Sequence, residues 1–180
     1  LFMTGNRIGG EGVKAISEAI LEQQESMRET NGVQHSDPAK PTDSFKTKFH
    51  GMQELYMGGT GMDSFGCQAL SRLLEKSCFL RVLSLPNCDI GDEEVRMLAL
   101  SIKANKDRLP IESLQLSFNN ITHHGLEAMA NALWRSLTLK ELKVDNNVIG
   151  DRGAHQMAAI IPAIKVMEVL DVGFNSITSQ

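Results

Sequence analysis

The sequence has few of the residues that build a disulfide framework, a membrane span or a nucleic-acid footprint. It contains three cysteines and 5% aromatic residues, and its net charge is −4 over 180 residues. An odd, unpatterned set of cysteines favours a reducing, intracellular compartment. A mildly acidic chain offers no basic surface for nucleic acid or anionic membrane. We also find no signal-peptide pattern and no apolar run long enough to cross a bilayer, so we expect a cytoplasmic location.

The chain does contain an internal repeat, and this repeat determines how each local motif is interpreted. The motif Leu-x-Leu-x-x-Asn-x-Ile, with some replacements, has six copies that begin at Leu1, Leu55, Leu83, Leu114, Leu142 and Leu170. These copies are spaced by 54, 28, 31, 28 and 28 residues, so the period is 28 with insertions in the first and third units. Counting from the first leucine, the Asn at +5 has an amide that can satisfy buried backbone groups where the chain leaves the strand.

The second half of each unit predicts a helix in the same register. Apolar residues recur at +12, +15 and +19, which is one stripe of a helix, and +16 holds a small residue. The apolar positions are Val95, Leu98 and Ile102 in the third unit, and Ala154, Met157 and Ile161 in the fifth. Glycines at +8 and +11 permit close approach at the helix entry, and Pro162 marks a bend or an end. Each unit is therefore predicted to form strand, loop and helix.

The period, the helix positions and the pattern Leu-x-x-Leu-x-Leu-x-x-Asn/Cys-x-Ile-Gly-x-x-Gly together resemble ribonuclease-inhibitor-type leucine-rich repeats. The resemblance covers nearly the whole chain apart from residues 25–50. It implies an α/β solenoid, a right-handed β-α superhelix with parallel strands on the concave side and helices on the convex side. We expect residues 1–180 to form one array of about six strand units, and to be a fragment of a longer array because neither end carries a cap.

The insertion at residues 25–50 is polar and contains Asn-Gly, Asp-Pro and Lys-Pro steps, which predicts an extruded flexible loop. A tolerated insertion is the simpler interpretation, because long surface loops cost little to close. The alternative is a binding or regulatory loop with Phe45 and Phe49 as anchors.

No catalytic, cofactor-binding or metal-binding motif survives once the repeat register is known. The run Gly58-Gly59-Thr60-Gly61 lacks the spacing and the lysine of a phosphate-binding loop, and is read as a repeat turn. His123 and His124 lack the further ligands that a metal site needs. We therefore expect no enzyme activity, no cofactor, no metal and no small-molecule substrate.

The candidate site is the concave strand face, where alternate residues point away from the core. The +1 row is Phe2, Tyr56, Ser84, Gln115, Lys143 and Asp171, and the −1 row is Glu54, Val82, Ser113, Glu141 and Val169. This mixed surface suits a protein partner, with Tyr56 as the main anchor and Lys143 and Asp171 beside it. Phe118 and Phe174 share the +4 position two repeats apart, where they form an aromatic patch on the ascending rim or pack locally.

Three functions are compatible with this sequence. The first is a protein-binding module or scaffold that uses the concave face and the loop rim. The second is a GTPase-activating regulator, an activity that the resemblance to similar repeats allows, with Arg7 or Asn120 as the acting residue. The third is a structural component of a cytoskeletal or ciliary assembly. The sequence does not identify the partner.

Overall fold

A computed structural model describes residues 1–32 and 51–178 of the chain. Five three-residue strands form one parallel sheet in the order β1-β2-β3-β4-β5. The strands are β1 (Glu54–Tyr56), β2 (Val82–Ser84), β3 (Ser113–Gln115), β4 (Glu141–Lys143) and β5 (Val169–Asp171). The leucines that begin units two to six are Cα partners across the whole sheet. The first unit joins through a single parallel bridge between Phe2 and Tyr56, so the predicted register is confirmed.

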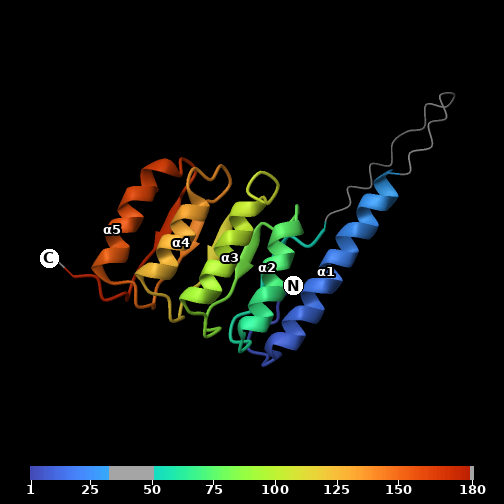
Figure 1. Cartoon of the computed structure of the whole chain (residues 1–180), viewed down its shortest axis with the longest axis horizontal. Coiled ribbons are helices and arrows are strands. Elements are labelled where there is room, and N and C mark those ends of the chain that lie inside the picture. Colours follow the sequence, from blue (N-terminus) through green and yellow to red (C-terminus); the bar gives the residue numbers. More distant parts are fainter. Residues whose placement is uncertain (33–50, 179–180) are drawn as a thin grey trace.

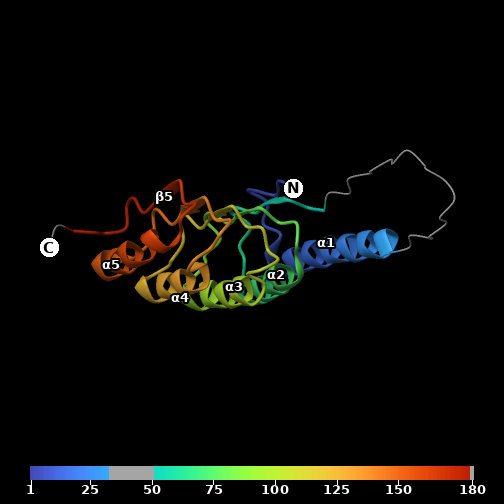
Figure 2. The same ribbon diagram turned by 90° about the horizontal axis from the view of Figure 1, so that it is seen from above.

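One helix follows each of the first five strand segments. The helices are α1 (Gly9–Gly32), α2 (Ser64–Lys76), α3 (Asp92–Ala104), α4 (His123–Leu133) and α5 (Gly150–Ile160), and a short 3-10 helix (Ile161–Ala163) follows α5. The five helices lie side by side in chain order in Figure 1. Figure 2 shows them on one side of the array and the strands on the other. The structure therefore confirms the α/β solenoid with a strand face and a helix face.

The core lies between the sheet and the helices and continues from one unit to the next. The strand leucines Leu55, Leu83, Leu114 and Leu142 are 0% exposed. Opposite them, the helix stripe of the third unit is buried as predicted, with Val95, Leu98 and Ile102 at 0–3% exposure. Each unit buries its apolar face on its neighbours, so the array gains stability as a stack and not from a single central core.

The asparagines at +5 connect each unit to the one before it. Oδ1 of Asn119 accepts hydrogen bonds from the backbone N–H groups of Cys88 and Ile90, both at 3.0 Å. Its Nδ2 donates to the carbonyls of Leu85 and Leu116 at 2.9 Å. Asn147 and Asn175 repeat this arrangement one and two units further along. The side-chain amide thus satisfies backbone groups that the loop cannot pair with itself, as the sequence predicts.

Two expectations about the helices are wrong in part. Residues 25–32 do not begin a loop, because the glutamate, methionine and arginine residues there favour a helix and α1 continues to Gly32. Residues 33–50, with Phe45 and Phe49, lie outside the described residues. Ile161 is 41% exposed instead of buried, and Ile160 takes its place in the core at 6%. The cause is Pro162, which ends α5 at Ile160 as the sequence predicts.

The glycines at +11 allow the helix entries to approach closely. A Cβ on Gly153 would lie 2.1 Å from Cγ2 of Ile149, and one on Gly125 would lie 2.5 Å from Oδ1 of Asp92. The Asp92 carboxylate accepts hydrogen bonds from Thr122 and from the backbone N–H of Gly125 in the next unit. These contacts leave no room for a larger residue at Gly125 or Gly153 and fix the spacing of the neighbouring helices.

Candidate protein-binding surface on the concave face and the ascending rim

The concave face carries the predicted +1 row in order. Tyr56, Ser84, Gln115, Lys143 and Asp171 are consecutive Cα partners across β1 to β5. Lys143 and Asp171 therefore lie beside each other, but they do not lie beside Tyr56. Three strand spacings, about 14 Å, separate β1 from β4. The face is thus divided into an aromatic end and a charged end.

Tyr56 forms the aromatic end together with Phe2. The two rings stack with centroids 4.4 Å apart and an interplanar angle of 6°. Phe2 is 74% exposed, so this stack presents an apolar face to solvent. The Tyr56 hydroxyl donates to Oε2 of Glu54 at 3.4 Å. Desolvation, and then the negative charge of Glu54, raises the pKa of Tyr56.

Glu141 is the centre of the polar part of the face. Its carboxylate accepts from Nζ of Lys143 at 2.8 Å, from the Ser113 hydroxyl at 2.5 Å and from Nε2 of Gln115 at 3.1 Å. Hydrogen bonds from Lys143 and then from Ser113 lower the pKa of Glu141 to about 2. The pKa of Lys143 is raised, first by its hydrogen bond to Glu141. These contacts hold both charges in place before any partner arrives.

The low pKa of Glu141 predicts a stability contribution that depends on pH. Because the folded pKa is depressed, this contribution is complete above the ordinary glutamate pKa and is lost as the pH falls toward about 2. The side chain is 25% exposed, so solvent screening limits the effect to about 1–2 kcal/mol. Between pH 6 and pH 2.5 we expect the Glu141→Gln variant to lose less unfolding free energy than the native chain. Urea unfolding at a series of pH values measures this difference, and equal losses would contradict the assignment.

Ser84 does not contribute directly to the surface. It is 4% exposed, and its hydroxyl donates to Oε1 of Gln115 at 2.8 Å. The Gln115 side chain in turn bonds to Glu141, so Ser84 positions a residue that a partner can reach. The alternation of faces along a strand predicts direction but not burial by a neighbouring side chain, which is why the sequence placed Ser84 with the exposed residues.

The ascending rim, the loop edge where each strand leads toward its helix, carries an unusual backbone feature at +4. This position has a positive φ in all six units: Gly5 (80°), Gly59 (69°), Asn87 (55°), Phe118 (57°), Asn146 (53°) and Phe174 (54°). Glycine and asparagine adopt this left-handed conformation readily, whereas bulky residues rarely do. The two phenylalanines are 56% and 85% exposed. The +4 position thus carries two exposed aromatic side chains where the backbone favours glycine or asparagine.

The two rim residues considered for a GTPase-activating role, Arg7 and Asn120, differ in their contacts. The Asn120 amide donates to Oδ1 of Asp89 at 2.7 Å, so it is already engaged within the rim. Arg7 is exposed at the first unit. No specific observation favours a GTPase-activating role for either residue. Sequence reasoning did not identify Glu141 as the centre of the concave network, although its place in the −1 row beside Lys143 was visible.

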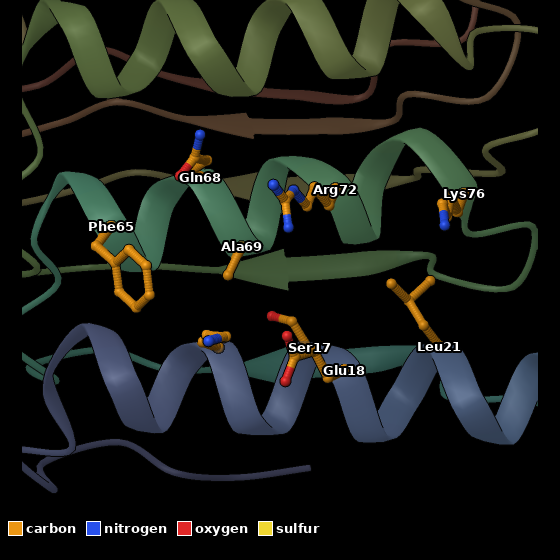
Figure 3. A pocket seen from close by; sticks show the side chains of 9 residues that line it. Ser17, Glu18, Leu21, Phe65, Gln68, Ala69, Arg72 and Lys76 are labelled. Carbon is orange, nitrogen blue, oxygen red and sulfur yellow. The ribbon is translucent and has the colours of Figure 1, made fainter.

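The helix side of the array carries a further hollow, and the described residues contain no metal-ligand cluster. A hollow of about 300 Å³ lies between α1 and α2 on the helix side, with Phe65, Arg72 and Glu18 among its lining residues (Figure 3). Nζ of Lys14 lies 5.3 Å from the centre of the Phe65 ring. Within residues 1–32 and 51–178, no group of three or more His, Cys, Asp or Glu is arranged to hold a metal ion. In the same ranges, no helix is long and apolar enough to cross a membrane. The His123 and His124 rings do converge, with centroids 3.9 Å apart, at the start of α4.

The fold and this surface define a solenoid of strand-loop-helix units with an open strand face. The Leucine Rich repeat family model matches residues 1–17, 76–99, 110–130 and 135–158. The porcine (Sus scrofa) ribonuclease inhibitor is 33% identical over 103 residues, which cover 57% of this chain and 22% of that protein. These matches support the ribonuclease-inhibitor-like leucine-rich-repeat family that the resemblance predicts.

Two further comparisons extend this result. Human (Homo sapiens) leucine-rich repeat-containing protein 73 is 28% identical over 130 residues, 72% of this chain and 41% of that protein. The chain spans less than half the length of either curated relative. A solved structure titled leiomodin-1 actin-binding site 2 aligns with a TM-score of 0.55 at 27% identity, covering 68% of this chain and 70% of that one. The architecture is thus shared with repeat proteins of several kinds, and repeats of this type suggest interaction with another protein.

Proposed function

We propose that the chain is a non-enzymatic, intracellular protein-binding module that holds its partner on the concave face and the ascending rim. The supporting observation is the pair Phe118 and Phe174. A residue with a Cβ costs about 1–2 kcal/mol in the left-handed conformation, and an exposed phenyl group recovers little of that by burial. The equivalent residues Asn87 and Asn146 show that the fold itself accepts asparagine at this position. The two aromatic side chains contribute little to folding, so we attribute their presence to the binding of a partner.

The spacing of the two phenylalanines suits one continuous contact. They lie two units apart, which corresponds to about 10 Å across a parallel sheet. Exposed aromatic anchors of this kind carry most of the binding energy in many interfaces. The charged pair Lys143 and Asp171 lies on the adjacent strands, where complementary charges on the partner would set its orientation. Tyr56 and Phe2 offer a second apolar contact at the far end of the face.

The test is a capture experiment with a matched control. The immobilised chain and its Phe118→Asn, Phe174→Asn double variant are exposed to the same cell lysate, and bound proteins are quantified by mass spectrometry. The control is Leu100→Asn, which removes a side chain of similar exposure, 63%, from α3 on the helix side. We expect at least one protein to fall about tenfold or more with the double variant and to be retained by the control. Identical captured sets for all three chains would contradict the proposed surface.

A cytoskeletal role is the second candidate, and the leiomodin-1 structure favours it. That structure is titled as an actin-binding site and shares 27% identity and a TM-score of 0.55 with this chain. Sedimentation with filamentous actin, and a binding titration with monomeric actin, tests this candidate directly. Saturable binding that the Phe118→Asn, Phe174→Asn variant loses would identify actin as the partner. Absence of binding to both forms of actin would remove this candidate and leave the general proposal intact.

A further inference from the structure

The descending rim, where each helix ends and the chain returns to the next strand, carries an apolar surface that the fold does not use. Trp134, the single tryptophan of the chain, is 43% exposed, and Leu137 is 83% exposed. The residues equivalent to Leu137 in neighbouring units are Leu109, which is 3% exposed, and Lys165, which is exposed. In these two units the position therefore holds either a buried apolar residue or an exposed polar one. Leu137 is instead both apolar and exposed.

Leu137 separates two hollows on this rim. The first, about 450 Å³, lies between the ends of α3 and α4 and is lined by Arg108, Arg135 and Leu137 among others. The second, about 480 Å³, lies between the ends of α4 and α5 and includes Trp134, Leu137 and Pro162. Both hollows lie where α3, α4 and α5 end. These helix ends form the upper edge of the array in Figure 1. Each hollow is large enough for side chains of a bound segment and too small for a folded domain.

The charges around these hollows are mostly positive. Lys106, Arg108, Arg135 and Lys165 line them, and Asp107 is the one carboxylate among the lining residues. Nζ of Lys106 donates to the Trp134 carbonyl at 2.5 Å, which satisfies the end of α4. In the described part of the chain no salt bridge involves Arg108, Arg135 or Lys165. A cation near a helix C-terminus is favourable by itself, but that effect does not require apolar side chains beside it.

We infer that the descending rim is a second docking surface, for an acidic peptide segment that carries a bulky apolar side chain. The apolar side chain packs against Trp134 and Leu137 in the larger hollow, and removes both from water. Flanking carboxylates then meet Arg135, with Arg108 on one side and Lys165 on the other. A discrete pair of hollows favours a peptide over a flat lipid surface, and the positive charges around the hollows favour an acidic one.

This surface lies on the opposite rim from Phe118 and Phe174, so it does not depend on the function proposed above. The single tryptophan gives a direct readout, because emission excited selectively at tryptophan comes from Trp134 alone. The probe is a synthetic peptide of about twelve residues, with glutamates around a central Leu-Leu pair and no tryptophan. A peptide with Ser-Ser in place of Leu-Leu and a lysine-flanked peptide are the matched probes.

We expect the acidic Leu-Leu peptide to produce a saturable blue shift of Trp134 emission, with about tenfold weaker binding by Arg135→Glu and by Leu137→Ser. Arg152→Glu, an exposed arginine at the opposite end of α5, is the charge control and should bind the peptide normally. Both Arg135 and Leu137 are exposed, and circular dichroism confirms that the variants fold. No saturable shift, or equal affinity for all variants, overturns the inference. A shift with phosphatidylserine vesicles but not with the acidic peptide also overturns it, in favour of a membrane surface.

Discussion

Replacing Asn147 with alanine is expected to lower the free energy of unfolding by about 3 kcal/mol or more. Asn147 is 7% exposed, and its Oδ1 accepts from the backbone N–H of Ile121 at 3.0 Å. Its Nδ2 donates to the carbonyls of Leu116 and Val144 at 3.0 and 2.9 Å. Alanine leaves the buried N–H of Ile121 without a partner, which costs about 1–3 kcal/mol. It also removes one of the two donors to each carbonyl, because Leu116 keeps Asn119 and Val144 keeps Asn175, and each lost hydrogen bond costs about 1 kcal/mol. Urea unfolding followed by circular dichroism measures the loss.

The matched control for Asn147 is Asn131→Ala. Asn131 is exposed on α4, where alanine is the better helix former, so this variant should be unchanged or slightly more stable. Both variants replace an asparagine with alanine, so the difference between their unfolding free energies measures the contribution of the buried amide. If both variants lose the same small amount of stability, the asparagines at +5 do not hold the units together and the account of the fold is wrong.

The second large effect is expected at the ascending rim, where replacing the two phenylalanines should raise stability and weaken partner binding. Phe118→Asn and Phe174→Asn should each raise the unfolding free energy by about 0.5–1 kcal/mol, because asparagine tolerates the left-handed conformation better than phenylalanine. The equivalent residues Asn87 and Asn146, with φ of 55° and 53°, already show the preferred choice. The same two substitutions should together abolish partner capture. Thermal and urea unfolding, with Leu100→Asn as the control, measure the stability change.

The result that would contradict this prediction is a loss of stability. It would mean that the phenyl groups pack locally on the rim and that their contacts outweigh the backbone strain, which is the alternative that the sequence leaves open. Higher stability with unchanged binding would instead leave the two aromatic residues without a function. A gain in stability with a loss of binding is the trade-off expected when a residue is kept for a partner and not for the fold.

Most of the fold was predictable because the repeat imposes one register on the whole chain. The leucines from Leu55 to Leu170 align across the sheet as their spacing predicts, and the asparagines at +5 make the backbone contacts expected of them. The errors fall where the repeat pattern is interrupted. Pro162 shifts the buried position from Ile161 to Ile160. Helix α1 extends to Gly32 because the glutamate, methionine and arginine residues before the Asn-Gly step favour a helix.

The candidate site was predictable as a set of rows but not as a set of contacts. The sequence placed Gln115 and Lys143 in one row, but it could not show that both bond to Glu141 or that Ser84 is covered by Gln115. The left-handed conformation at +4 did leave a sequence signal, because glycine and asparagine fill four of the six positions. The exposure of Leu137 left none, since an equivalent leucine, Leu109, is buried.

The most direct test of the central claim is photo-crosslinking from the rim itself. A photoreactive phenylalanine analogue is placed at position 118 on the ascending rim, and in a separate variant at position 100 on α3. The two variants distinguish binding at the rim from binding on the helix side. If the ascending rim binds a protein, position 118 should yield a discrete crosslinked protein from cell lysate that position 100 does not yield, and unlabelled native chain should compete for it. Equal crosslinking from both positions, or crosslinking from position 100 alone, would contradict binding through the concave face and its ascending rim.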